Sequence, residues 1–390
     1  MELRNLPAEL TPEGRVAERR RRIQDELAVN LSLLATEPER IGSAEEKNCE
    51  QMFGTVPIPV GYAGPLSVEF SDGKISSIHL PLATTEGALV ASINRGCKAL
   101  GDGVKVTSTY HGISRSIAWR VGSGQKAVGS TIKTLEKEWK KIGEATSSHL
   151  KILGSTIDES GGYVFLTINA DTSEAMGMNM VTIAAQAIGD FLAEKCGMEL
   201  ITIAANVDSD KKPSARTHKL GRGYEVKAEA VIPSSVIETV LKTTPEKMLA
   251  VADAKLAHGS KLAGAIGSNL HAANVIAALY LATGQDAAHV VEGSMCDTSF
   301  RQLAVGSWLF AVRLPAILVG VRGGGTGLPA QSQCLKMLLH PTTQQHNSTT
   351  TRPAQRLAES IGAAVLAGEL SLLAALAEQQ LAKSHKKLAR

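Results

Sequence analysis

An apolar segment near the C-terminus, GAAVLAGELSLLAALA at 362–377, limits the possible folds more than any other feature of this 390-residue chain. A helix that is apolar on all its faces has to be buried. The segment is shorter than the roughly 18 residues needed to cross a bilayer, and it carries Glu369 at its centre. We therefore predict a core helix of a soluble protein with no membrane partner.

The N-terminus and the cysteines indicate the compartment. No apolar run of a signal peptide is present, and Glu2, Glu9 and Glu13 argue against an Arg-rich transit peptide. The five cysteines are scattered without a CxxC pair, which favours free thiols in a reducing compartment over disulfides or zinc. We expect a cytoplasmic protein without a metal site.

The composition excludes several classes of protein. Aromatic residues make up only 4% of the chain, which also contains 36 glycines. A base-stacking platform or a sheet-only barrel is therefore disfavoured, and helices packed closely against sheets are expected. The net charge of +3 is too small to indicate nucleic acid as a partner, although it suits anionic ligands.

The first and second regions of the chain differ in pattern. Residues 1–49 are polar and helical in pattern, and Thr11 followed by Pro12 is a good helix start. Residues 50–116 alternate short strand-like runs with Gly-rich turns around one helix pattern. The length corresponds to roughly two to three domains.

The rest of the chain divides near residue 202. Within 117–202, amphipathic segments at 127–147 and 175–195 flank the strand-like run YVFLTI and precede LITIAAN. Strands that alternate with helices in this way predict a small α/β unit. From 203 onward the pattern is helix-rich, with a polar loop at QQHNSTTTRP.

The stretch ATTEG precedes a strong helix pattern. Thr85 is a candidate cap, and Glu86 would then lie in the first turn, where the helix dipole favours a carboxylate. Ser92 and Arg95 follow on the same helix. A capped helix without any function is the ordinary interpretation of these residues.

The stretch DKKP is a candidate for carbonyl chemistry. Asp210 and Pro213 flank Lys211 and Lys212, which favours a held and directed ammonium group. A lysine aimed at a carbonyl oxygen stabilises the negative charge that develops there. A solvated loop is the alternative.

Two further stretches are candidates for contact with an anionic ligand. Asp171 and Glu174 have capping-box spacing ahead of a helix that begins with Met and Gly residues. The run VGVRGGGTGL lacks the third glycine of GxGxxG because Leu328 stands there, so it does not by itself indicate a nicotinamide cofactor. His385, taken alone, is an ordinary surface histidine.

Eight segments occur in a distinctive order: GTVPIPVGYAGPL, LPLATTEGALVASINRGCKAL, EAMGMNM, DKKP, GRGYEVKAEAVIP, HAANVIAALYLATGQDAAH, GGGTGLP and AGELSLLAALAEQQLAKSH. Together, from about residue 50 to 386, they resemble the catalytic portion of class I 3-hydroxy-3-methylglutaryl-coenzyme A (HMG-CoA) reductases. Animal and fungal class I members carry a membrane anchor ahead of this portion, and the chain looks like a free-standing form.

The resemblance implies an α+β fold with a helical N-terminal segment (1–49) and a large, helix-rich domain around a central helix (50–116 and 203–390). A small ferredoxin-like α/β domain that binds the cofactor would be inserted at 117–202. The implied reaction is the reduction of HMG-CoA to mevalonate and coenzyme A by NADPH, with NADH as a second option, in isoprenoid biosynthesis. Homodimers or dimers of dimers are also implied, with Glu86 and Lys211 of one site on different subunits.

Four catalytic residues are implied by the resemblance. Lys211 would polarise the carbonyl and hold the oxyanion, and Glu86 would protonate the carbonyl oxygen during aldehyde reduction. Asp286 would couple to both through hydrogen bonds, and His385 would protonate the departing coenzyme A thiolate. The residues implied to bind substrate are Ser92, Arg95, Arg115, Asn206, Asp210, Lys212, Lys255, His271, Asn274 and Leu372. Those implied to bind cofactor are Ser147, Ser148, Glu174, Met176, Gly177, Met178, Asn179, Gly324, Gly325 and Thr326.

The chain departs from the family pattern mainly at the cofactor site. Glu174 stands where the family usually has Asp, and EATSSHLKI lacks the Arg that commonly grips the 2′-phosphate of NADPH. Two serines, His149 and Lys151 remain in that stretch, and Arg322 precedes GGGTG. We predict that NADPH is still preferred, by a modest margin.

Two alternatives stay open at this point. The same fold can act as a catabolic mevalonate dehydrogenase, because both directions of the reaction share one transition state. It can also serve as a non-catalytic acyl-CoA-binding protein. Retention of Glu86, Lys211, Asp286 and His385 argues against the binding-only alternative, which does not need all four.

Overall fold

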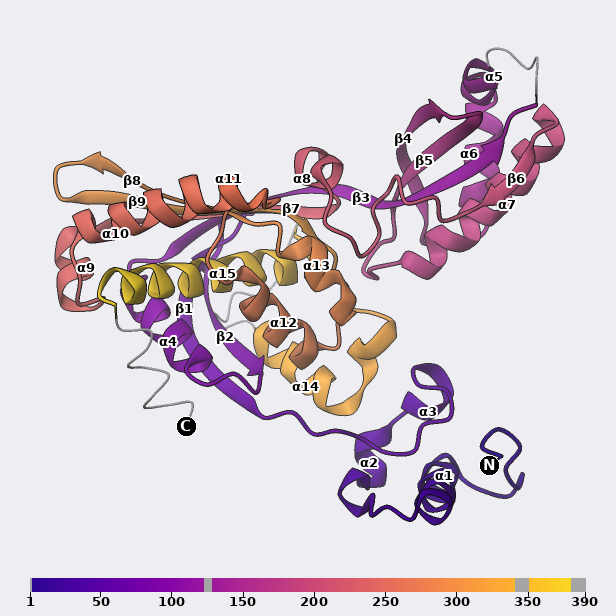
Figure 1. Cartoon of the computed structure of the whole chain (residues 1–390), viewed down its shortest axis with the longest axis horizontal. Helices are drawn as coiled ribbons and strands as arrows, with labels where there is room; N and C mark the ends of the chain where they lie inside the picture. Colours follow the sequence, from indigo (N-terminus) through magenta and orange to yellow (C-terminus); the bar gives the residue numbers. More distant parts are fainter. Residues whose placement is uncertain (1, 123–127, 341–350, 380–390) are drawn as a thin grey trace.

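A long buried helix, α15 (Pro353–Ala377), forms the centre of the molecule, as the apolar segment predicted. A computed structural model describes residues 2–122, 128–340 and 351–379 (Figure 1). By length and composition α15 could cross a membrane, but 78% of its most apolar 18-residue window is buried inside the protein. The helix contacts α4 (Leu89–Ala99), α12 (Ala272–Thr283) and the large sheet.

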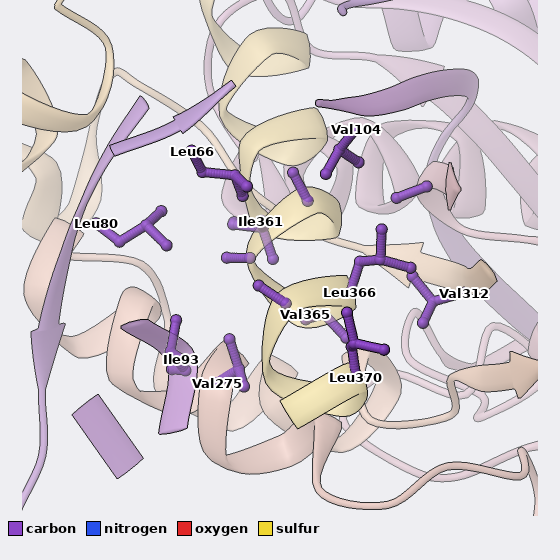
Figure 2. Close-up of a cluster of buried hydrophobic side chains, with 14 of the residues drawn as sticks. Leu66, Leu80, Ile93, Val104, Val275, Val312, Ile361, Val365, Leu366 and Leu370 are labelled. Carbon is purple, nitrogen blue, oxygen red and sulfur yellow. The ribbon is translucent and has the colours of Figure 1, made fainter. Parts of the chain in front are cut away.

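Figure 2 shows how this core is filled. Ile361, Val365, Leu366 and Leu370 of α15 point into a cluster of buried side chains from the sheet and the neighbouring helices. Glycines allow the helices to approach closely: a Cβ on Gly96 of α4 would collide with the Ala367 backbone of α15. Burial of this apolar surface is the main source of the stability of the large domain.

Two carboxylates interrupt the apolar surface of α15, and each has several donors. Glu369 accepts hydrogen bonds from the backbone N–H groups of Leu270 (2.8 Å) and His271 (2.7 Å) and from the Thr298 hydroxyl (2.6 Å). Both backbone N–H groups lie at the start of α12, where N–H groups lack partners within the helix. Glu359 is held by serine side chains in a similar way. These bonds explain how an apolar helix keeps buried charges.

The large sheet has the strand order β2-β1-β3-β7-β9-β8. All neighbours are antiparallel except β1 and β3, which are parallel. The strands are β1 (Val60–Glu69), β2 (Ile75–Ala83), β3 (Val104–Arg120), β7 (Gly223–Pro233), β8 (Asp297–Ala304) and β9 (Ser307–Ile317). The region after residue 203, expected to be helix-rich, thus also contributes three strands.

The second sheet begins where β3 changes its partner. Residues Lys105–Gly112 of β3 pair with β7, whereas Ile113–Arg120 pair with β5. The predicted boundary at residue 117 therefore falls inside one continuous strand. The other strands of this sheet are β4 (Lys151–Ser160), β5 (Tyr163–Asp171) and β6 (Glu199–Thr202).

This small unit has a ferredoxin-like βαββαβ order. The strand order is β4-β5-β3-β6 and every pair is antiparallel. Its helices are α5 (Val128–Thr134), α6 (Glu136–Glu144) and α7 (Met178–Cys196). The unit has its own hydrophobic cluster and projects from one end of the molecule (Figure 1). The fold is thus of the mixed α+β class.

The N-terminal helix α1 (Pro12–Leu27) starts as expected. Thr11 accepts a hydrogen bond from the Gly14 N–H (3.1 Å), and Pro12 occupies the first helical position. The arginine run is only partly solvated, because Arg19 is buried and binds Glu45 (2.8 Å). A 3₁₀-helix, η1 (Ser32–Leu34), and two short α-helices, α2 (Pro38–Ile41) and α3 (Ala44–Lys47), follow in this segment.

Short elements connect the strands and long helices after residue 203. They are α8 (Ala215–Leu220), α9 (Ser234–Thr239), α10 (Pro245–Val251), the π-helix η2 (Ala252–Gly259), α11 (Ser260–Ala263), η3 (Ala287–His289), α13 (Val290–Gly293), η4 (Gly324–Gly327) and α14 (Pro329–Leu338). Several of them carry candidate site residues.

Candidate active site

The loop after β6 holds three non-glycine residues in the left-handed backbone region. The φ angles are 63° at Asn206, 54° at Ser209 and 58° at Lys211. Such conformations cost about 1–3 kcal/mol each and persist where the surroundings fix them, commonly at functional sites. The strained backbone therefore indicates that the DKKP loop is held in one conformation by its surroundings and is not a solvated turn.

Lys211 forms an ion pair with Asp286, as the family resemblance implied. Its Nζ lies 2.8 Å from the Asp286 carboxylate, and both side chains remain partly exposed, at 42% and 36%. The backbone N–H of Lys211 donates to the Glu292 carboxylate at 2.5 Å, which fixes the residue at its base. An accessible ammonium group held by buried groups is suited to binding a carbonyl oxygen.

Asp286 is held at the start of η3. Its carboxylate caps this turn by accepting the Ala288 N–H at 3.0 Å. Burial raises the pKa of Asp286, but hydrogen bonds from Lys211 and Ala288 and the nearby His289 charge outweigh it, so the pKa lies below the ordinary value. Asp286 is thus an anion at neutral pH, and Lys211 keeps a fixed partner.

Beneath this pair lies a buried layer of charges centred on Arg222. Its guanidinium contacts Asp210 (3.0 Å) and Glu292 (2.9 Å), and it donates to the hydroxyl and carbonyl oxygens of Ser114. Arg222 and Glu292 have almost no exposed side-chain surface. Asp210, His289 and Glu292 are close enough to suggest a metal site, but the Arg222 guanidinium already pairs with both carboxylates.

Sequence reasoning missed Arg222, Glu292 and His289. All three lie within or just beyond quoted motifs, GRGYEVKAEAVIP and the stretch that ends in GQDAAH. Their partners come from distant parts of the chain, so local spacing carried no sign of the network. A signal did exist, since a charged residue inside an otherwise apolar motif often has a buried partner.

Several substrate candidates join this layer. Arg115 of β3 contacts Asp210 (3.3 Å) and the buried Asp208 (3.6 Å), whose pKa burial raises. Lys212 donates to the Asp210 carbonyl oxygen at 3.0 Å. The structure thus brings Arg115, Asp210 and Lys212 together with Asn206 in one loop region. Lys255 lies apart, exposed on the π-helix η2.

A second group of substrate candidates lies on α4, α12 and α15. Ser92 and Arg95 both contact the Ser371 hydroxyl, at 2.9 and 3.0 Å. Ser371 was not among the predicted residues, although its neighbour Leu372 was. Burial lowers the pKa of Arg95, which has no carboxylate partner among the described residues. Its charge is therefore available to an anion.

His271 and Asn274 start α12 beside this second group. His271 precedes the helix, and its Nε2 lies near the position that a Cβ on Gly368 of α15 would take, 3.3 Å away. That nitrogen is buried and has no hydrogen-bond partner among the described residues. Asn274 is half-buried one turn later. An unpaired polar atom of this kind fits a ligand contact.

The helix predicted at Glu86 starts later than expected. α4 begins at Leu89 with Ala88 at its cap position, so neither the Thr85 cap nor the first-turn position of Glu86 is correct. The Glu86 N–H instead donates to the Thr84 hydroxyl at 2.9 Å. The Glu86 carboxylate is exposed and forms no hydrogen bond or ion pair with the described residues. One chain therefore leaves Glu86 out of contact with Lys211.

The capping box predicted for Asp171 and Glu174 is also wrong. α7 starts at Met178, and its cap position is Gly177, which has a φ of 88°. Asp171 instead binds Arg352 through two bonds of 2.8 Å, and the Glu174 carboxylate accepts the Ala354 N–H at 2.9 Å. Both acidic residues thus connect the small unit to the start of α15.

The two glycine-containing cofactor stretches lie side by side. The Glu174 carbonyl accepts the N–H groups of Val321 and Arg322 (2.8 and 3.2 Å), and Ala175 forms a bridge with Arg322. A Cβ on Gly320 would collide with the Met176 N–H. The structure therefore brings Glu174, Ala175 and Met176 against residues 320–322, which directly precede Gly324, Gly325 and Thr326, and Gly177 and Met178 follow at the start of α7.

This junction also reaches the Lys211–Asp286 pair. A Cβ on Gly284, two residues before Asp286, would collide with the Gly325 backbone. The Met178 sulfur accepts a hydrogen bond from Arg222 at 3.2 Å. The Ser147 hydroxyl lies 3.5 Å from the Met180 sulfur, whereas Ser148 and Asn179 are exposed near the same helix start. The cofactor candidates thus form a path from the small unit to Asp286.

His385 and most of QQHNSTTTRP lie outside the described residues.

Comparison with known proteins decides the family. The family model described as hydroxymethylglutaryl-coenzyme A reductase matches residues 15–390. The chain belongs to the HMG-CoA reductase family. The predicted function, reduction of HMG-CoA to mevalonate, is thereby confirmed at the level of the family.

Individual relatives agree with this family. The chain is 38% identical to 3-hydroxy-3-methylglutaryl-coenzyme A reductase of Methanothermobacter thermautotrophicus, over 95% of this chain and 92% of the relative. It is 41% identical to reductase 2 of Dictyostelium discoideum, over 87% of this chain and 65% of the relative. The class I-like assignment follows from this similarity.

The fold has a solved counterpart. The class II reductase of Streptococcus pneumoniae, described as bound to NADPH in open conformations, superposes with a TM-score of 0.66 at 18% identity. The match covers 92% of this chain and 96% of that chain. It supports the α+β fold of an HMG-CoA reductase.

Proposed function

We propose that this chain carries out both reduction steps at a site built on the Lys211–Asp286 pair, with NADPH as the preferred cofactor. The observation that carries the proposal is the 2.8 Å contact between these side chains, at the end of a strained loop and above a buried charged layer. Reduction of a thioester to an alcohol takes two hydrides and passes through a hemithioacetal and mevaldehyde. Each hydride transfer leaves negative charge on the former carbonyl oxygen, which Lys211 would stabilise.

The other catalytic roles follow from the protons that the reaction consumes. The first oxyanion re-forms a carbonyl as the hemithioacetal loses coenzyme A, whereas the alkoxide left by the second hydride transfer needs a proton, which Glu86 is proposed to supply. The thiolate of coenzyme A needs one as it leaves, and His385 is proposed to supply that proton. Asp286 keeps Lys211 in place. The negative charge of Asp286 also keeps the Lys211 ammonium group protonated until the oxyanion forms.

Both groups of substrate candidates, the one near the DKKP loop and the one on α4, α12 and α15, contain donors suited to the substrate carboxylate. Among the described residues, Lys212 Nζ binds only a neutral carbonyl oxygen, so its charge remains available, and the Arg95 guanidinium binds only the Ser371 hydroxyl and carbonyl oxygens. Cationic side chains of this kind form strong charge-assisted bonds to carboxylates. We assign Arg115, Lys255, Ser92 and Asn274 to the same task. The large domain (50–116 and 203–390) would therefore bind HMG-CoA.

The small domain (117–202) is proposed to bind the nicotinamide cofactor at its junction with η4. Side chains on Gly323 and Gly324 would project into open space, and both residues have positive φ, so this loop presents bare backbone to a ligand. The start of α7 supplies free N–H groups for a phosphate. The residues fit the cofactor, which supplies the hydride when bound.

Glu86 is exposed and has no side-chain partner within the described part of the chain, which supports a homodimer, alone or as a dimer of dimers. In this arrangement Glu86 of one subunit would complete the site of Lys211 in the other. We further propose that the enzyme works in the cytoplasm in the biosynthetic direction.

Complementation between two inactive variants tests the shared site. Glu86→Gln and Lys211→Ala are expected to be nearly inactive as separate homodimers. When the two are co-expressed, half of the dimers are mixed, and each mixed dimer has one intact site. Activity should therefore return to about a quarter of the wild-type value per protein.

The control is co-expression of Lys211→Ala with Asp286→Ala, which lie in the same site of one chain. This pair should give no recovery if Lys211 and Asp286 act together in cis. No recovery with the Glu86 variant would contradict the shared site, and full activity of Glu86→Gln alone would contradict its catalytic role.

A further inference from the structure

His289 is a wholly buried histidine directly behind the catalytic pair. It ends η3, three residues after Asp286, and none of its surface is exposed. Its Nε2 lies 3.7 Å from the Asp286 carboxylate oxygen that also binds Lys211 Nζ. Its Nδ1 lies 3.4 Å from the Glu292 oxygen that accepts the Lys211 backbone N–H. The imidazole therefore faces both carboxylates that hold Lys211.

The surroundings of the ring are mostly charged. Asp286 and Glu292 face it from its own segment, and Asp210 lies within 4.8 Å of the same group of atoms. Arg222 approaches from the start of β7 and binds Asp210 and Glu292. Tyr280 of α12 lies close to Glu292 and Asp286, and burial together with these negative charges raises the pKa of its hydroxyl. Lys211 completes the set above Asp286.

Only a ring that donates from both nitrogens makes both carboxylate contacts attractive, because a neutral imidazole has one donor and one acceptor. The Nε2 atom is buried without a hydrogen bond among the described residues, so its interaction with Asp286 is electrostatic at the distance shown. A positive charge there favours the ionised form of Asp286, as does the Lys211 ammonium.

We propose that His289 is a positioning residue of the reductase site, which holds the Asp286 carboxylate ionised and in register with Lys211. The inference rests on the catalytic roles proposed for Lys211 and Asp286. His289 is wholly buried behind Asp286, so it acts through that carboxylate. Burial raises the pKa of Asp286 and the neighbouring donors lower it, His289 among them, so loss of the imidazole should let Asp286 take up a proton at higher pH.

Two substitutions separate the ring nitrogens. The amide nitrogen of glutamine reaches about as far as Nε2, whereas that of asparagine reaches about as far as Nδ1. His289→Gln should therefore keep a donor toward Asp286, and His289→Asn should keep only the contact with Glu292. We expect kcat for HMG-CoA reduction to fall by about tenfold or more in His289→Asn and by about threefold or less in His289→Gln at the optimal pH. KM for HMG-CoA should change by less than about twofold in both.

The pH dependence of kcat distinguishes the proposed role from a purely structural one, which would leave this dependence unchanged. Both replacements are neutral at every pH, so the acidic limb of kcat should move to higher pH in both variants. His218→Gln is the matched control, because His218 also contacts a carboxylate, that of Asp297 at 2.8 Å, but lies on α8. Its profile should superpose on that of the wild type.

Asp286→Asn, measured in parallel, separates a failure of the role proposed for Asp286 from a failure of the role proposed for His289. If it keeps wild-type turnover, the proposed role of Asp286 fails, and this inference with it. If Asp286→Asn is inactive while both His289 variants match the wild type in kcat and pH profile, only the inference about His289 is overturned. Equal losses in both His289 variants with an unmoved acidic limb and a lowered melting temperature would also overturn it, in favour of a packing role.

Discussion

Adjacent residues of the DKKP loop have different partners. Lys211 Nζ binds a carboxylate, whereas Lys212 Nζ binds a backbone carbonyl oxygen. A carboxylate partner fixes an ammonium group in direction and keeps it charged, while a carbonyl partner leaves most of its electrostatic attraction available to a ligand. The positive φ of Lys211 turns the chain between the two residues and makes this division possible.

In the proposed function, single residues would also decide the choice of cofactor. The loop before β4 lacks an arginine, so the 2′-phosphate of NADPH would meet Lys151, His149 and two serine hydroxyls. A lysine recognises phosphate less specifically than the planar fork of an arginine. We expect kcat/KM for NADPH to exceed that for NADH by roughly ten- to a hundredfold, or about 1.4–2.8 kcal/mol.

Replacing Lys151 by alanine should erode this preference and leave NADH kinetics nearly unchanged, measured as the ratio of the two kcat/KM values. Lys137→Ala, on the exposed side of α6, is the control and should keep the ratio. A wild-type enzyme that favours NADH would contradict the proposed pocket and give weight to a catabolic role.

At the scale of elements, α15 organises the core through its two buried carboxylates. Glu369 accepts three hydrogen bonds and thereby fixes the start of α12, which carries His271 and Asn274. Glu369→Ala would leave those donors unpaired in an apolar interior. We expect a loss of about 3 kcal/mol or more in the free energy of unfolding, on the scale of breaking a buried charged network.

Urea denaturation at one fixed protein concentration would measure this loss. Glu378→Ala is the control at the C-terminal cap of the same helix, where the carboxylate pairs with Lys247 and accepts the Thr243 hydroxyl near the surface. Its unfolding midpoint should stay close to that of the wild type. Equal midpoints for the two variants would show that Glu369 is not a structural support.

Elements also show what the sequence could predict. The apolar pattern of 362–377 predicted the buried helix, because burial is the only outcome for a helix without a polar face. The starts of α4 and α7 were predicted wrongly, because Thr85 has the position of a cap and Asp171 and Glu174 have the spacing of a capping box. Gly177 instead takes a left-handed conformation at the start of α7, and the Glu174 carboxylate binds a distant N–H at the start of α15.

At the scale of the whole molecule, the sequence motifs supplied the residues of the site but not their connections. The Lys211–Asp286 pair was expected from the family resemblance and is present. The layer beneath it was not expected, since Arg222, Glu292 and His289 meet only after β3, β7 and η3 have packed together. Glu86 stays out of contact with Lys211 in one chain, which no pattern within a single sequence predicts from physics alone.

The central claim is that the Lys211–Asp286 pair is the catalytic centre of an HMG-CoA reductase. The direct measurement is the initial rate of NADPH oxidation at 340 nm with HMG-CoA, for the wild type and for Lys211→Ala, with Lys219→Ala on α8 as an exposed lysine control. The account predicts HMG-CoA-dependent oxidation by the wild type and the control, and a loss of at least about a hundredfold in kcat for Lys211→Ala, the scale of losing an oxyanion donor. Turnover by a folded Lys211→Ala variant close to that of the wild type would contradict it.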